Sequence, residues 1–286
     1  MPFLGSAEVY TVQEDIAVFR KADSLFAAQD FTRAALEYER VIFGATDPDI
    51  INAALFGRVQ SFKQMQEFAR ASGELRRIRL FMLNPEQLVD YFYEKILLYY
   101  LAGSFSEARG AIGAMYFSIP DSALSKNTLM LQVLVYNELQ EWDLARQTAL
   151  RYAHNLPSPQ RETMESLIEQ LYSERNLPNL RSQRVANVLA FVPGLGHIYA
   201  GHWLEGMVSF LLNSAALAFG VHQVLSGYFI TGYLVGAGTL SATYFGGFGR
   251  ASFLVDKHNY RVTRSFNNHV RKRLLEPQRG SDFEQI

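Results

Sequence analysis

Apolar residues recur at helical spacing between residues 13 and 176, and short polar segments interrupt them at regular intervals. Around the first interruption the apolar positions recur at helical spacing, at Leu25, Phe26, Phe31, Ala34, Ala35, Tyr38, Val41 and Ile42. This is the period of an amphipathic α-helix. Helix-breaking prolines follow at a similar interval, at Pro48, Pro85, Pro120 and Pro157. The pattern predicts an all-α chain of short paired helices.

The polar interruptions form an internal repeat. Each contains an aromatic residue and, three positions later, an alanine, and successive copies are 37 residues apart: Phe31 and Ala34, Phe68 and Ala71, Phe105 and Ala108, Trp142 and Ala145. A constant period over four copies indicates a repeat architecture. We expect polar residues to end one helix, the aromatic to pack into the turn, and the alanine to let two helices approach. Residues 13–176 would then form a solenoid of four 37-residue helix pairs and a capping helix from about Ser158 to Arg175.

The turn sequences resemble those of the tetratricopeptide family. Asp30–Ala34 and Ser104–Ala108 are closest to its G-x-aromatic-x-x-A turn, and the usual glycine is present only at Gly103. The resemblance covers about residues 13–155. It implies a concave groove, lined by the first helix of each pair, that binds a peptide or helix of a partner protein. The alternative is a spacer whose groove binds nothing.

Charge almost disappears in residues 185–249, where Glu205 is the only Asp, Glu, Lys or Arg. Two stretches in this region, from about Gly206 to Leu225 and from about Tyr228 to Gly247, approach the ~20 residues that cross a bilayer. Small residues recur in both, and they let membrane helices pack closely. We therefore expect residues 185–249 to form a transmembrane helical hairpin. The alternative is a buried hairpin of a soluble protein.

A short motif precedes the two apolar stretches. It has the form P-G-x-G-x-x-Y-x-G and also contains a histidine, with its residues at Pro193, Gly194, Gly196, His197, Tyr199 and Gly201. Followed by two spans, this motif resembles a widespread two-helix membrane domain, over about residues 185–250. The resemblance implies a membrane location but no reaction. Its combination with helical repeats resembles bacterial repeat membrane proteins of unknown function.

Few residues indicate chemistry. The chain has no cysteine, which removes thiolate metal sites and a cysteine nucleophile. His197, His202 and Glu205 are the best metal-ligand candidates, but they lack the spacing of a helical ligand pair. We expect no catalytic residue, no metal and no cofactor. Polar residues inside a membrane can nevertheless mark a functional site, so three remain candidates: Glu205, Asn213 and His222.

The remaining segment, residues 250–286, is basic and amphipathic. From Arg250 to Arg279 eight Lys and Arg accompany two acids, and one face carries Val262, Phe266, Val270 and Leu274. This pattern is typical of a helix that lies on an anionic membrane surface. The expected contacts to lipid headgroups are Arg261, Arg264, Arg271, Lys272 and Arg273. The alternative is a solvated charged tail.

Two spans would place the repeats and the tail on the same side of the membrane. Basic residues flank the hairpin and are absent from Gly220–Ser226, which favours the cytoplasmic side of a bacterial inner membrane. Leu4–Ala7 resembles the end of a signal peptide, which would place the repeats in the periplasm instead. The net charge of −1 gives no sign of nucleic-acid binding.

These features together predict a non-enzymatic scaffold, anchored in the membrane, whose solenoid groove binds a partner protein. The alternatives are a membrane enzyme or transporter component that uses polar intramembrane residues, and a periplasmic envelope-assembly factor.

Overall fold

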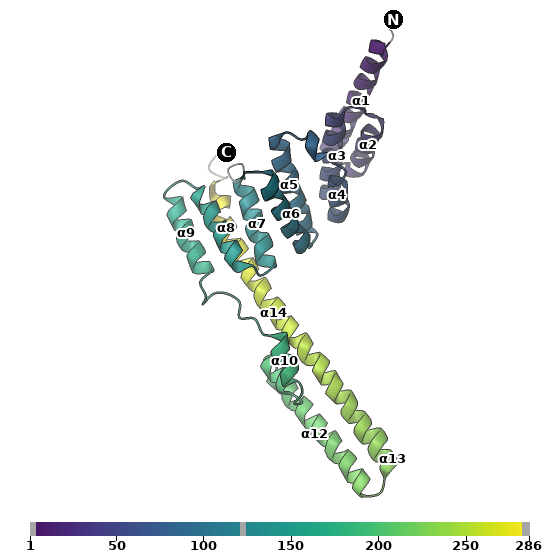
Figure 1. The fold of residues 1–286 in the computed structure, drawn as a ribbon, viewed down its shortest axis with the longest axis vertical. Helices are drawn as coiled ribbons and strands as arrows, with labels where there is room; N and C mark the ends of the chain where they lie inside the picture. Colours follow the sequence, from purple (N-terminus) through teal and green to yellow (C-terminus); the bar gives the residue numbers. More distant parts are fainter. Residues whose placement is uncertain (1–3, 121–123, 282–286) are drawn as a thin grey trace. The chain divides into compact units, whose positions relative to one another are not determined.

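The structure is a computed structural model that describes residues 4–120 and 124–281, with side chains described for residues 16–120 and 124–275. All regular elements in these residues are helical, so this part of the chain is all-α, as expected (Figure 1). The chain divides into two compact units between Glu169 and Gln170.

Consecutive helices of the first unit pack against one another along the chain. They are α1 (Leu4–Ala27), α2 (Phe31–Gly44), α3 (Pro48–Gln64), α4 (Phe68–Leu75), the 3₁₀ turn η1 (Leu80–Met82), α5 (Pro85–Leu101), α6 (Phe105–Ser118), α7 (Lys126–Glu138) and α8 (Trp142–His154). Helix α9 (Gln160–Leu171), in the region of the expected cap, ends just beyond the boundary of the unit. First helices of neighbouring pairs also meet, because α1 contacts α3 and α5 contacts α7.

The four turns within the helix pairs share one backbone geometry. In each turn one residue has positive φ: 62° at Gln29, 61° at Gln66, 73° at Gly103 and 61° at Gln140. The N–H of the following residue donates to the carbonyl oxygen five residues earlier, at 2.9 Å in all four turns. This is a Schellman motif, which satisfies carbonyl groups at the end of the first helix. The turn geometry therefore recurs along the backbone with the same 37-residue period as the sequence pattern.

The repeated side chains occupy equivalent places in these turns. The four aromatic residues are the first residues of α2, α4, α6 and α8: Phe31, Phe68, Phe105 and Trp142. The four alanines have no exposed surface: Ala34, Ala71, Ala108 and Ala145. A larger side chain at such a position would have to displace a packed neighbour. Around the first turn, Ala34 lies in a core cluster with Ala22, Tyr38 and Val41.

The second unit contains two short helices followed by two long ones. They are α10 (Gln183–Leu189), α11 (Leu195–Tyr199), α12 (Trp203–Leu225), the short α13 (Phe229–Thr231), the π-helical segment η3 (Gly232–Ala237) and α14 (Gly238–Ser281). Helix α12 packs against η3 and α14, and Figure 1 shows α12 and α14 side by side. Helix α14 continues without interruption past residue 249, so the expected boundary between hairpin and tail falls inside one helix.

Among the described residues one helix, α12, is long and apolar enough to cross a membrane, judged by length and composition alone. Only 11% of its most apolar window is buried in the protein. The second expected span, Tyr228–Gly247, does not form a comparable helix, so the expectation of two such helices is corrected to one. Its residues are divided among α13, η3 and the start of α14, and from Arg250 onward α14 is charged.

Candidate functional site

The glycine motif before α12 brings backbones into close contact. Gly194 has a φ of 89°, and a Cβ added there would clash with the carbonyl oxygen of Gly206 in α12. A Cβ at Gly196 would lie 2.8 Å from the Cβ of Ala251 in α14. Both positions therefore require glycine, the first for conformation and space and the second for space. The motif joins α11 to the two long helices.

Hydrogen bonds hold the rest of this motif in place. The hydroxyl oxygen of Tyr199 accepts a bond from the backbone N–H of Ser182 at 2.9 Å. The side-chain amide of Asn259 in α14 accepts from the N–H of Arg181 and donates to its carbonyl oxygen, both at 2.8 Å. A Cβ at Gly201 would lie 2.7 Å from the guanidinium of Arg181. Of the motif, Gly194, Gly196, Tyr199 and Gly201 are thus tied to packing of the second unit, and Pro193 precedes them in the turn before α11.

The lone acidic residue of the apolar region forms an ion pair. The two oxygens of Glu205, in the first turn of α12, accept bonds from Nε and Nη2 of Arg250 at 3.0 and 3.3 Å. His202 Nδ1 lies 3.2 Å from the same carboxylate. Arg250 is the first cation after the apolar region, and it is 45 residues away from Glu205 along the chain. The ion pair joins the start of α12 to α14.

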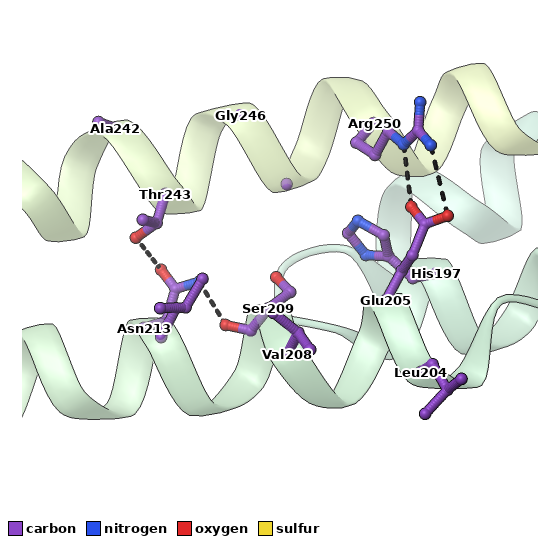
Figure 2. A pocket seen from close by; sticks show the side chains of 12 residues that line it. His197, Leu204, Glu205, Val208, Ser209, Asn213, Ala242, Thr243, Gly246 and Arg250 are labelled. Carbon is purple, nitrogen blue, oxygen red and sulfur yellow. Dashed lines mark hydrogen bonds and ion pairs between the residues drawn. The ribbon is translucent and has the colours of Figure 1, made fainter.

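A second polar contact joins the same helices further along the groove. Asn213 is 3% exposed; its amide nitrogen donates to the carbonyl oxygen of Ser209 at 2.7 Å, and its amide oxygen accepts from the hydroxyl of Thr243 at 3.0 Å. Figure 2 shows both bonds, the first within α12 and the second between the two long helices. The side chain of Asn213 thus has partners on both helices, which gives it a structural role.

The ion pair and the amide lie in one open groove of about 500 Å³. Its α12 side carries Leu204, Val208 and Leu212, whereas its α14 side is formed by small residues, among them Ala242 and Gly246. Figure 2 shows Glu205 and Arg250 at one end of the groove and Asn213 and Thr243 toward the other. The groove is therefore charged at one end, polar along its floor and apolar along one wall.

His197 lies at the base of the charged end. It is 4% exposed, and within the described residues its Nδ1 is buried without a hydrogen-bond partner. Burial lowers the pKa of His197 below its ordinary value of 6.5, against an opposing contribution from the charge of Glu205. The imidazole is therefore neutral at pH 7, and Glu205 and Arg250 supply the fixed charges that face the groove.

The structure brings together two of the three polar candidates. Glu205 and Asn213 both line the groove, whereas His222 is exposed near the end of α12 and is not part of it. Among the described residues no group of three or more His, Asp or Glu side chains could hold a metal ion. His202 and Glu205 are adjacent, but His197 does not join them in such a group. Sequence reasoning missed Arg250 and Thr243, which supply the partners of Glu205 and Asn213.

The apolar face of the basic segment has a partner inside the second unit: Phe266 packs edge-to-face against Tyr172, with ring centroids 5.9 Å apart. That this helix lies on an anionic membrane surface stays a prediction. The five expected headgroup contacts are exposed: Arg261, Arg264, Arg271, Lys272 and Arg273. Residues 282–286 lie outside the described residues.

A second cleft, of about 460 Å³, lies in the first unit. The first helices of three pairs line it, with Phe19 from α1, Ile50 from α3 and Gln87 from α5. Its rim carries both signs of charge, at Arg20 and Asp49. The cleft thus has an apolar floor and a rim of mixed charge.

Comparisons with protein families, curated proteins and solved structures find no match.

Proposed function

We propose that this protein is a membrane-anchored scaffold, in which a tetratricopeptide-like solenoid formed by α1–α9 binds a partner protein and the second unit holds it at the bilayer. One observation carries the proposal. Helix α12 has the length and composition of a membrane span and leaves most of its apolar surface unburied. In water such a surface would be a large exposed apolar patch, which soluble monomers rarely carry.

The segment after α12 supports a hairpin. Tyr228, Phe229, Ile230, Tyr233 and Leu234 are all exposed, and each is large and apolar. They belong to the α13–η3 segment, which packs against α12. We propose that this segment returns through the bilayer beside α12. The repeats and the tail would then share one side of the membrane, with the cytoplasmic side favoured by the flanking basic residues.

Partner binding is assigned to the cleft on α1, α3 and α5. Because each pair contributes its first helix, the side chains that line the cleft come from consecutive repeats, as the tetratricopeptide resemblance implies. Membrane attachment would raise the local concentration of solenoid and partner and so strengthen a weak contact. The basic residues of α14 would add electrostatic attraction to anionic headgroups.

A charge placed on the exposed surface of α12 tests the anchor. Leu211 is 59% exposed near the middle of the helix, so Leu211→Arg removes little packing in the protein. In a bilayer the same change costs about 2.5–3.5 kcal/mol. We expect it to reduce membrane association of the full chain, measured by flotation of the expressed protein with liposomes. Leu36→Arg, at 56% exposure on α2, is the matched control and should float like the wild type.

A wild-type chain that stays soluble without detergent and does not float would refute the anchor. Partner binding is tested separately, by crosslinking in native membranes and comparing Ile50→Asp in the cleft with alanine substitutions at His197, Glu205, Asn213 and His222. Loss of the captured partner with Ile50→Asp supports the scaffold. If only the four alanine substitutions abolish the cellular phenotype, the protein acts as a membrane enzyme or transporter component.

A further inference from the structure

The groove between α12 and α14 is charged at one end and apolar along one wall, as a binding site for an amphiphile would be. One end holds the carboxylate of Glu205 and the guanidinium of Arg250, and both side chains remain partly exposed. From there Leu204, Val208 and Leu212 form an apolar wall along α12. The polar groups further along the floor, at Asn213 and Thr243, already bond to each other. A ligand with a charged head and an apolar chain therefore matches the groove from end to end.

The groove is open beside Gly246, a glycine that the internal packing does not need. A Cβ added at Gly246 would have nothing within 4 Å. Gly220 and Gly236 are different, because a Cβ at Gly236 would clash with the Cα of Gly220. Glycine at position 246 therefore has no role in the contact between the two helices. Because Gly246 has no side chain, the groove is wider on its α14 side, opposite the wall formed by leucine and valine.

The charged end offers opposite charges side by side. Arg250 uses Nε and Nη2 for Glu205, and in the described residues its Nη1 has no hydrogen-bond partner. The carboxylate of Glu205 can accept further bonds beyond those from Arg250, since each of its oxygens has two lone pairs. His197 adds no charge at neutral pH, because burial lowers its pKa. A purely anionic headgroup would be repelled by Glu205, and a purely cationic headgroup would be repelled by Arg250.

We propose that this groove binds a single phospholipid whose headgroup carries both a phosphate and a primary ammonium, as in phosphatidylethanolamine. The phosphate accepts hydrogen bonds from Arg250, the ammonium donates to Glu205, and one acyl chain lies along Leu204, Val208 and Leu212. A quaternary ammonium such as choline has no N–H to donate, and glycerol carries no positive charge. The site is thus selective for the primary amine. The inference rests on the proposed membrane location of α12.

Native mass spectrometry of the full chain in mild detergent tests the site. The protein is incubated with equal amounts of phosphatidylethanolamine, phosphatidylcholine and phosphatidylglycerol that have identical acyl chains. We expect one bound lipid per chain and about tenfold more phosphatidylethanolamine than either competitor, as for a charge-assisted hydrogen bond that only one lipid can make. Inorganic phosphate at the same concentration should not displace the lipid, because it lacks the chain that contacts the apolar wall.

Two pairs of variants locate the binding. Gly246→Leu fills the groove and should abolish lipid retention, whereas Gly238→Leu, an exposed position on α14 where a Cβ also meets nothing within 4 Å, should retain lipid like the wild type. Glu205→Gln keeps the shape of the side chain but removes its charge, and it should remove the preference for phosphatidylethanolamine over phosphatidylcholine. Arg264→Gln, on the exposed surface of α14, should leave that preference unchanged.

Equal retention of the three lipids by the wild type, or equal retention by the Gly246 and Gly238 variants, would overturn the inference. Displacement of the lipid by inorganic phosphate would overturn it as well. Liposome flotation of the wild type separates this failure from that of the anchor. A chain that floats but shows no headgroup preference refutes only the lipid site, whereas a chain that does not float refutes the membrane location on which the site depends.

Discussion

Three glutamines hold a backbone conformation that glycine adopts more easily. Gln29, Gln66 and Gln140 have φ values of 61–62°, and the equivalent residue in the third repeat is Gly103. All four positions are exposed, so a change of side chain removes no buried contact. The left-handed conformation costs a residue with a Cβ about 1–2 kcal/mol. Glycine loses about 0.4–1 kcal/mol of this advantage because its unfolded state is more flexible.

Replacing each glutamine by glycine should therefore stabilise the first unit by roughly 0.5–1 kcal/mol per site. The sites are 37 residues apart and share no hydrogen-bond partner, so the effects should add. The triple variant Gln29→Gly, Gln66→Gly, Gln140→Gly should gain about 2 kcal/mol, and for a unit of this size its melting temperature should rise by about 4–8 °C.

Thermal unfolding of the full chain in detergent micelles, followed by far-ultraviolet circular dichroism, measures the change. Gln147→Gly is the matched control, because Gln147 is exposed inside α8 and has no need of positive φ. That change should destabilise by about 1 kcal/mol. Gly103→Gln should likewise lower the melting temperature. A triple variant that melts at or below the wild-type temperature, while Gln147→Gly behaves as expected, would refute the shared turn geometry.

Three further outcomes follow from other contacts. Gly236→Val should destabilise the second unit in detergent by about 1–3 kcal/mol, since its side chain must displace the backbone of Gly220, whereas Gly238→Val has open space and should melt within the error of the wild type. Burial lowers the pKa of His197, so the unfolded state binds the proton first and stability should fall as the pH drops below 6.5. His197→Asn should lose this part of the pH dependence in thermal melts between pH 5 and 8, and the exposed His222→Asn should keep it. Tyr116→Phe leaves the fully buried Gln132 without the hydroxyl that donates to its amide oxygen at 2.7 Å, and urea titration should show a loss of about 1–3 kcal/mol; an unchanged midpoint would mean that this oxygen has another donor.

The positions of the four turns could be predicted from the sequence because their signal is periodic. An aromatic and an alanine at a constant interval mark where each turn begins, and the structure places Phe31 and Trp142 at the same point of their helices. The positive φ values of the three glutamines could not be predicted from the sequence. Glycine and asparagine are the usual residues at this position, so a glutamine such as Gln66 gives no sign of positive φ in the sequence.

Contacts between distant segments could not be predicted from one sequence. The lone acid Glu205 indicated that a partner was needed, and Arg250 was the next charged residue, yet nothing in the spacing placed them on facing helices. The tail shows the same limit. Its i, i+4 apolar pattern correctly identified one face of a helix, but the pattern is the same whether Phe266 contacts lipid or, as the structure shows, Tyr172.

The glycines of the second unit fall into two groups, those required for helix packing and one that lines the groove. Gly194, Gly196, Gly206, Gly220 and Gly236 each face an atom that a Cβ would approach too closely, so they are required by the packing of this chain with itself. Two of them, Gly194 and Gly196, belong to the glycine motif. The motif therefore serves the packing of the helices and does not indicate a reaction or a ligand. Gly246 meets no such atom and lines the groove. Changes at the first group should destabilise the second unit whatever ligand is present. A change at Gly246 should leave the fold intact and alter only what the groove holds, and this difference is the reason that ligand specificity is assigned to residues outside the motif.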